Sequence, residues 1–245
     1  MSRIFITGSA DGLGKAAAQT LLADGHQVVI HARNEQRLDA VQDLLRQGAQ
    51  SVAGDLSDLQ QTLGVAEQVN RLGRMDAVIH NAGVYSGPQV LPVNIVAPYV
   101  LTALITRPNR LVYLSSGMHQ SGRAALEGLD WSGRTASGSY SDSKLLVTTL
   151  ALAVARRWPD AISSAVDPGW VPTKMGGPGA PDDLRLGHLT QEWLATGEDS
   201  EARVSGAYWH HQRRIEPHAA ARDVAFQDEL LTVLERATGI ALRPS

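Results

Sequence analysis

A phenol and an ammonium group lie at a spacing that could move protons at neutral pH. In the segment Tyr140-Ser-Asp-Ser-Lys144, the two groups are four positions apart, so a helix would place both on one face. Free tyrosine titrates at about pH 10, and a nearby cation favours the phenolate, so we expect Lys144 to lower the pKa of Tyr140. Such pairs also occur by chance on many helix surfaces.

Two hydroxyl groups follow a buried apolar segment upstream of this pair. Ser115 and Ser116 end the run Leu111-Val-Tyr-Leu-Ser-Ser116, which has the composition of a strand. In open α/β sheets, ligands bind at the carboxyl ends of the strands. Ser116 is therefore a candidate to contact a reacting oxygen atom, and the alternative is that both serines only form a turn.

A glycine-rich turn near the start of the chain has the character of a nucleotide-binding loop. Gly8, Gly12 and Gly14 follow the first predicted strand and precede a predicted helix. Glycine permits positive φ and lets the backbone approach a pyrophosphate at the helix N-terminus. Glycine-rich turns also merely cap helices, but this position in the chain favours dinucleotide binding.

The second predicted strand ends in His31-Ala32-Arg33-Asn34. Folds that prefer NAD usually carry an acid here that binds the ribose hydroxyls, whereas Arg33 suits a 2′-phosphate. Arg33 could also be an ordinary solvated residue, and Asp11 stands in the glycine turn where NADP enzymes frequently carry a base. We predict NADP (NADPH) over NAD.

Short runs rich in isoleucine and valine alternate with amphipathic stretches along the chain. We predict strands at 4–7, 28–31, 50–53, 78–80, 110–115, 162–166 and, last, 206–209, and helices near 13–26, 35–47, 57–72, 91–106, 141–157, 183–195 and 221–237. This alternation predicts parallel strands joined by crossover helices. The expected fold class is α/β, with residues 1–245 forming a single doubly wound Rossmann domain whose mostly parallel sheet is flanked by helices.

Two proline-containing segments carry further predictions. The glycine- and proline-rich stretch after Pro168 follows a strand, so we expect a flexible substrate flap at about 172–205. Asn94 precedes Pro98 by four residues, and proline has no N–H to donate to the Asn94 carbonyl. The helix over 91–106 should therefore kink there and leave that carbonyl to accept from water.

Composition excludes several classes of protein. The chain has 245 residues, of which 43% are hydrophobic, and a net charge of -3, so it can bury a large core and has no basic surface for nucleic acid. Without cysteine it forms no disulfide or thiolate metal site. We predict no membrane span and a cytoplasmic enzyme. We also predict no metal site, because no His-x-x-x-His pair occurs and the adjacent His210 and His211 would point apart in a strand.

The motifs together resemble the short-chain dehydrogenase/reductase family from Arg3 to about Leu242. In the family's order the chain carries Thr7-Gly-x-x-x-Gly-x-Gly14, Asp55-Leu56, Asn81-Ala-Gly83, Asn94, Ser116, Tyr140-x-x-x-Lys144, and Pro168-Gly169 through Thr173. Each motif alone is weak, but seven in register are hard to obtain by accident.

The resemblance implies a role for each matching residue. Tyr140 would be the general acid/base that protonates a carbonyl oxygen, Ser116 would hydrogen-bond that oxygen, Lys144 would hold the nicotinamide ribose, and Asn94 would bind a water that relays protons. The implied cofactor-binding residues are Gly8, Asp11, Gly12, Leu13, Gly14, Arg33, Asn34, Asp55, Leu56, Asn81, Ala82, Gly83, Tyr140, Lys144, Pro168, Gly169, Val171 and Thr173.

The implied function is NAD(P)-dependent hydride transfer to or from a small-molecule carbonyl or secondary alcohol. The alternative is a non-catalytic NADP-binding sensor or scaffold, which we disfavour because all four catalytic positions are filled. The family often forms a homodimer or homotetramer through the helix that begins at Tyr140.

Two departures from the family pattern are visible. His80 replaces an asparagine, and the long interval from Ser116 to Tyr140 resembles retinol-dehydrogenase-like and related bacterial branches. This insertion should form a loop at the substrate mouth. Candidate walls of the substrate pocket are Trp131, Trp170, Met175 and Trp193.

Overall fold

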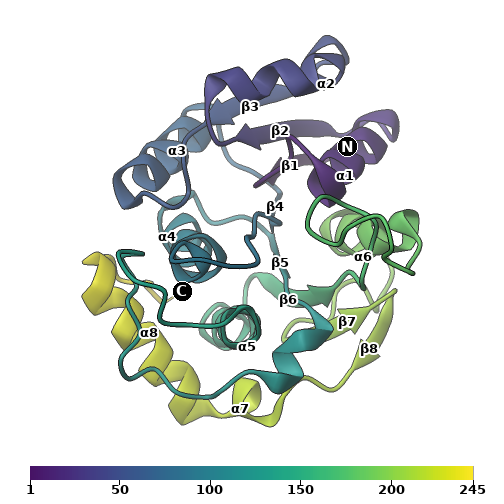
Figure 1. Cartoon of the computed structure of the whole chain (residues 1–245). Helices are drawn as coiled ribbons and strands as arrows, with labels where there is room; N and C mark the ends of the chain where they lie inside the picture. The colour runs from purple at the N-terminus through teal and green to yellow at the C-terminus, as the bar shows by residue number, and fades with distance from the viewer. Residues whose placement is uncertain (245) are drawn as a thin grey trace.

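One sheet of eight strands organises the chain (Figure 1). The computed structural model describes residues 1–244. The strands lie in the order β3-β2-β1-β4-β5-β6-β7-β8, and all pairs are parallel except β7 with β8. Their bounds are β1 Arg3–Ile6, β2 Gln27–Ala32, β3 Gln50–Ala53, β4 Ala77–His80, β5 Arg110–Leu114, β6 Ile162–Asp167, β7 Ala207–His210 and β8 Arg213–Ile215. The order reverses between β1 and β4, which confirms the doubly wound α/β class.

Helices cover both faces of this sheet (Figure 1). They are α1 Gly12–Ala23, η1 Glu35–Val41, α2 Gln42–Arg46, α3 Leu59–Arg71, η2 Pro92–Val96, α4 Ala97–Leu104, η3 Gly117–Ser121, α5 Tyr140–Arg157, α6 Leu184–Thr196, α7 Ala219–Arg222 and α8 Val224–Thr238. Helices α1 and α6 pack side by side on one face, while α3, α4, α5 and α8 cover the other. None of the helices in residues 1–244 is long and apolar enough to cross a membrane.

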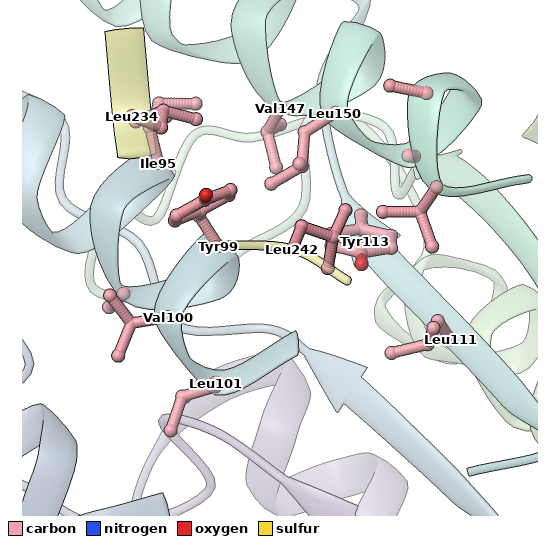
Figure 2. Close-up of a cluster of buried hydrophobic side chains, with 14 of the residues drawn as sticks. Ile95, Tyr99, Val100, Leu101, Leu111, Tyr113, Val147, Leu150, Leu234 and Leu242 are labelled. Atoms are coloured by element: carbon pink, nitrogen blue, oxygen red, sulfur yellow. The ribbon is translucent and has the colours of Figure 1, made fainter. Parts of the chain in front are cut away.

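Each face of the sheet has its own hydrophobic core. Along β1, Ile4 and Ile6 belong to the cluster beneath α1 and α6, whereas Phe5 belongs to the opposite cluster. Successive side chains of a strand point to opposite faces, so a strand buried on both sides must be apolar throughout. Figure 2 shows part of the second cluster, where Tyr99 from α4 and Leu150 from α5 pack beside Tyr113 of β5.

Several predicted elements differ from the observed ones. The predicted helix 35–47 is a 3₁₀-helix followed by one short α-helix, and the predicted helix 91–106 begins with a π-helical turn. The predicted helix 221–237 is preceded by α7 and starts after the extended residue Asp223, whose side chain caps it. Strand β7 is not the last strand: a hairpin turn at His211 and Gln212 leads into β8. Sequence analysis missed this turn because it contains no glycine or asparagine.

The predicted flap over 172–205 is too long. Helix α6 lies inside this range, and its residues Gly187, Thr190 and Leu194 are buried against α1 and the sheet. The irregular part runs from residue 168 to residue 183, ahead of the helix that Asp183 caps. The many glycines and prolines at the start of the range obscured the amphipathic helix behind them. Whether the irregular part moves stays a prediction.

Helix α5 is covered by its own chain. Its residues from Asp142 to Val154 are all buried, and α7 and α8 pack along it. Arg156 and Arg157 both pair with Asp228 of α8, which ties the two helices together at the surface. The C-terminal helices thus cover one face of α5, and subunit pairing through this helix stays a prediction.

A substitution at Leu230 of α8 measures how much the packing of α8 on α5 stabilises the fold. Its side chain is fully buried, so Leu230→Ala should lower the free energy of unfolding by about 2–5 kcal/mol through lost burial and a residual cavity. The matched change Val224→Ala, at a position that is 50% exposed on the same helix, should cost no more than about 0.5 kcal/mol. Urea unfolding followed by circular dichroism measures both, and equal losses would contradict the prediction.

Candidate active site

A large cavity lies at the carboxyl edge of the sheet. Its volume is about 1280 Å³, and its walls come from the segments that follow β1, β2, β4, β5 and β6 together with the end of β7. Of the predicted site residues, all except Gly14 and Asn94 line it. The motifs identified from sequence are thus brought together in one place.

The glycine turn lines the cavity, and its backbone is packed too closely for side chains at Gly8 and Gly14. Gly8 has a φ of 64°, and a Cβ there would lie 2.9 Å from the Ala82 Cα. A Cβ on Gly14 would lie 2.7 Å from the Gly8 carbonyl oxygen and closer still to the Asn81 amide. The Asn81 Nδ2 donates to the carbonyl oxygens of Thr7 and Gly8 at 2.9 and 3.2 Å. Asn81 therefore holds the turn in shape, and this bare backbone concavity fits a pyrophosphate.

The next part of the wall carries fixed charges. The Arg33 Nε lies 3.8 Å from an Asp55 carboxylate oxygen, and the other Asp55 oxygen accepts from the backbone N–H and hydroxyl of Ser57. The Asn34 Oδ1 accepts from the Arg37 backbone N–H at 3.1 Å and so caps η1. This cap brings Arg37 to the cavity as well.

Asp11, the acid in the glycine turn, is matched by two cations that sequence analysis did not identify. The Lys174 Nζ lies 2.8 Å and an Arg37 guanidinium nitrogen 3.6 Å from Asp11 Oδ2. The hydrogen bond from Lys174 lowers the pKa of Asp11. Arg37 lies one turn after Arg33 and Lys174 directly follows Thr173, and those positions were the only signal for them in the sequence.

Tyr140 lines the same cavity and is held there by the start of α5. Ser139 and Asp142 form a capping box, in which the Ser139 hydroxyl accepts from the Asp142 N–H and the Asp142 carboxylate accepts from the Ser139 N–H, each at 3.0 Å. Lys144 follows one turn later, with its Nζ 5.3 Å from the centre of the Tyr140 ring. The same Nζ donates to the Leu114 carbonyl at 2.7 Å, so α5 and β5 fix the ammonium together.

The expected lowering of the pKa of Tyr140 by Lys144 is wrong for this structure. Burial raises the pKa of Tyr140 to about 12, the Ser116 hydroxyl partly offsets this, and the charge of Asp167 adds to the increase. Burial lowers the pKa of Lys144 to about 8. Removing either group from water disfavours its charged form, and burial is the largest cause of both shifts. Tyr140 is consequently a neutral phenol at pH 7, the form that can donate a proton.

Asn94 lies behind the cavity wall in the π-helical turn, so the helix is not regular at this point, as predicted. Its side chain donates to the Val84 carbonyl at 3.0 Å and to the Ser143 hydroxyl at 2.9 Å, and it accepts from the Val84 N–H at 2.9 Å. It thereby joins the segment after β4 to α5. A Cβ on Gly83 would lie 3.5 Å from the Asn94 Oδ1 and 3.6 Å from the Lys144 Nζ, so both polar groups lie close to Gly83. The water relay stays a prediction.

The insertion before Tyr140 does not reach this cavity, contrary to expectation. None of its residues from Gln120 to Ser139 is among the lining residues, and Trp131 instead lines a smaller hollow of about 350 Å³ beside η2 and α8. Trp193 packs edge-on against Trp209 away from the site. Trp170 and Met175 do line the cavity, as expected.

Histidines behave differently from the sequence-based expectation. His80 is buried, stacks on Tyr113 and lies 3.1 Å from the Thr102 hydroxyl, and burial lowers its pKa to about 3. The rings of His210 and His211 do not point apart but stack with centroids 3.9 Å apart, because the strand ends between them. Within residues 1–244, no group of three or more histidine or acidic side chains could hold a metal ion.

The cavity has further lining residues that belong to no sequence motif and that sequence analysis did not identify. They include the exposed side chains Tyr85 and Met118, and Asp167 and His210 at the ends of β6 and β7. Tyr85 lies against Tyr140, with ring centroids 4.9 Å apart. These side chains surround the space next to the phenol.

Known proteins resemble this chain over its full length. An uncharacterized oxidoreductase of Emericella nidulans is 40% identical over 99% of this chain and 99% of its own. The short-chain dehydrogenase chry4 of Gibberella zeae is 37% identical over 99% of both chains. Retinol dehydrogenase 13 of Mus musculus is 25% identical over 98% of this chain and 84% of its own, in line with the branch that the insertion suggested. The sequence profile of short chain dehydrogenases matches residues 2–107.

Solved structures share the fold. A protein from Mycobacterium paratuberculosis superposes with a TM-score of 0.81 at 22% identity, covering 99% of this chain and 95% of its own. A blue fluorescent protein from a metagenomic library, solved in complex with NADPH, has a TM-score of 0.69 at 22% identity, covering 85% of this chain and 95% of its own.

Fold and site together define an α/β oxidoreductase that uses a nicotinamide dinucleotide. The chain belongs to the short-chain dehydrogenase/reductase family, and its class of function is that of an NAD(P)-dependent oxidoreductase.

Gly14→Ala tests the packing of the glycine turn. The added Cβ meets backbone and the Asn81 amide, so the turn must shift, at a cost to folding stability of about 1–3 kcal/mol and with weaker NADPH binding. Gly64→Ala is the matched control, because nothing lies within 4 Å of its Cβ in the middle of α3 and alanine there favours the helix. Thermal unfolding and NADPH fluorescence titration measure both effects. Unchanged nucleotide affinity in Gly14→Ala would disprove the tight packing.

Proposed function

We propose that the protein is an NADP(H)-dependent reductase or dehydrogenase of the carbonyl reductase and alcohol dehydrogenase type. The observation that carries this proposal is that Ser116, Tyr140 and Lys144 line the same cavity as the glycine turn. When bound there, a nicotinamide dinucleotide supplies hydride to a carbonyl carbon or accepts it from an alcohol. The bare glycine backbone, which side chains cannot fill, supports the fit of such a cofactor.

The chain's own groups handle the proton. In the reducing direction, the neutral Tyr140 hydroxyl donates its proton to the carbonyl oxygen, and the Ser116 hydroxyl stabilises the negative charge that develops there. Lys144 stays next to the phenol through its bond to the Leu114 carbonyl and stabilises the phenolate that remains. Asn94 joins the Val84 segment to α5 and so positions Lys144 relative to Gly83.

The proposed cofactor site follows the wall of the cavity. The pyrophosphate would be held by the glycine turn, Leu13 and Asp11. The adenosine part would contact Asp55, Leu56, Asn81, Ala82 and Gly83. The nicotinamide would lie against Pro168, Gly169, Val171 and Thr173. Val171 is buried, and Thr173 lies close to Gly12. The segment after β6 therefore meets the glycine turn.

Preference for NADP over NAD is supported by the charges around the adenosine end. Arg33, Arg37 and Lys174 face the cavity, and Asp11 and Asp55 only partly balance them. The guanidinium groups suit a 2′-phosphate. The structural neighbour that was solved with NADPH agrees with this choice.

A non-catalytic sensor or scaffold is the less favoured alternative. Such a protein needs no phenol held beside a buried ammonium. Burying Lys144 also costs stability, because burial lowers its pKa despite the charge of Asp167. We further propose that the substrate is a small-molecule carbonyl compound or alcohol and that the protein works in the cytoplasm.

Tyr140→Phe tests the chemistry. The ring and its packing against Tyr85 are retained while the transferable proton is lost, so turnover should fall by at least about 10²-fold with NADPH affinity nearly unchanged. NADPH oxidation with a panel of ketones and aldehydes, together with a fluorescence titration of NADPH, measures the two quantities. Unchanged turnover would rule out Tyr140 as the proton donor.

Arg33→Ala and Arg37→Ala test the cofactor preference. Each change should reduce the ratio of kcat/KM for NADPH over NADH by roughly 10- to 100-fold, the range expected for one hydrogen bond to a charged phosphate. Arg46→Ala is the control, because Arg46 ends α2 and does not line the cavity. A parent protein that prefers NADH would overturn the assignment of NADP.

A further inference from the structure

Asp167 and His210 form a polar pair inside the catalytic cavity that the proposed reaction does not use. They end the adjacent parallel strands β6 and β7 and lie opposite each other in the register. The His210 Nδ1 lies 3.3 Å from both the carboxylate Oδ2 and the carbonyl oxygen of Asp167. Both residues line the cavity beside Ser116 and Tyr140.

The carboxylate is held firmly and close to the reacting groups. Asp167 is only 8% exposed, and its Oδ1 accepts from the Gly169 N–H at 2.9 Å. Its Oδ2 would lie 3.1 Å from a Cβ on Gly117, the residue after Ser116, so the carboxylate packs closely against this glycine. Its charge raises the pKa of Tyr140 and so opposes the phenolate that the reaction forms. The same charge stabilises the ammonium form of Lys144, whose pKa it raises, and it also faces the His210 imidazole.

The imidazole is held in one orientation. The turn after His210 places His211 and Gln212 at φ values of 47° and 60°, as a two-residue hairpin turn requires, and a glutamine rarely adopts such a value. The Gln212 N–H donates to the Thr190 hydroxyl at 3.0 Å, and the His211 ring stacks on His210. Strained backbone of this kind persists only where surrounding contacts impose it, and it is concentrated at functional sites.

The pair sets the hydrogen-bonding character of the cavity. A carboxylate at Nδ1 keeps the proton on that nitrogen, so the neutral ring presents Nε2 as an acceptor. His210 is partly exposed, with 35% of its side chain accessible, so Nε2 can be reached by a ligand. Tyr85, Met118 and Trp170 supply exposed aromatic and thioether surface around the same cavity. A flat apolar body with one hydrogen-bond donor fits these surroundings.

We propose that His210, oriented by Asp167, accepts a hydrogen bond from a hydroxyl or N–H group of the substrate and thereby selects aromatic carbonyl compounds that carry such a donor. This inference rests on the proposed function and specifies the substrate class for the same site. His210 is the specificity-determining residue, and Asp167 is a positioning residue that fixes its tautomer.

The test uses matched pairs of substrates. The probes are 3- and 4-hydroxyacetophenone and their methoxy counterparts, which keep the ring and the ketone but lack the donor. For at least one pair, kcat/KM should favour the hydroxy compound by about tenfold or more, because a site built around a hydrogen bond rejects an analogue that cannot make it. In His210→Leu this ratio should fall to near one. His26→Leu, a change at the far edge of the sheet beside Ser2, should leave the ratio unchanged.

Asp167→Asn separates this role from a structural one. Its Oδ1 can still accept from Gly169, but its amide would face the His210 Nδ1 as a donor and compete with the backbone carbonyl of residue 167, so Nε2 is no longer fixed as an acceptor. The hydroxy-over-methoxy ratio should therefore drop as in His210→Leu, whereas a general change in the pKa of Tyr140 affects both substrates equally and cancels. An unchanged ratio in either variant, or equal kcat/KM for both members of every pair in the parent protein, overturns the proposal.

A second readout distinguishes failure of this inference from failure of the proposed function. Calorimetry measures the affinity of the same pairs for the NADP-saturated protein. One outcome is no turnover, with the hydroxy compound still bound more tightly than the methoxy compound and this difference lost in His210→Leu. That result would count against the proposed reaction alone. Equal affinities for both members of each pair, whether or not turnover occurs, would count against the role of Asp167 and His210.

Discussion

Parallel alignment of the central strands is the constraint on which the site depends. β1, β4, β5, β6 and β7 run in the same direction, so the residues that follow them emerge at a single edge of the sheet. Helices on both faces keep these strands buried and in register, because a one-residue slip would exchange the two hydrophobic cores. The glycine turn after β1, the serines after β5 and the Asp167 segment after β6 share one cavity for this reason.

Within the cavity, burial competes with charge. Tyr140 and Lys144 are adjacent, yet the pKa of the phenol is raised and that of the ammonium lowered, so each is held nearer its neutral form. Asp167 shifts this balance further towards the neutral phenol. Elsewhere on the wall, Arg33, Arg37 and Lys174 surround two carboxylates and leave it rich in cations. The same cavity thus holds a proton-donating phenol and a group of cations, which suits a cofactor that carries both phosphates and a reactive ring.

The C-terminal part of the chain adapts this framework. α7 and α8 cover α5, and Tyr99 of α4 donates to the Ile240 carbonyl at 2.6 Å, so the chain end closes the face that α4 and α5 would otherwise expose. The insertion before Tyr140 packs on the same side, where Gly133 lies close to Pro92 of η2. The segments on this side pack against one another and away from the cavity, whereas the end of β7 and the 168–183 segment line the catalytic cavity.

The amino-acid sequence by itself determined the α/β class, the glycine turn and the Ser116, Tyr140 and Lys144 constellation, because these depend on local period, on glycine and on fixed spacing along the chain. Only the tertiary structure decided which other side chains join them. Asp167 meets His210 through strand pairing, and Arg37 and Lys174 meet Asp11 across the cavity. The pKa of Tyr140 likewise follows from how deeply the fold buries it. Contacts between distant segments and the loss of solvent are properties of the packed chain, and no local pattern encodes them.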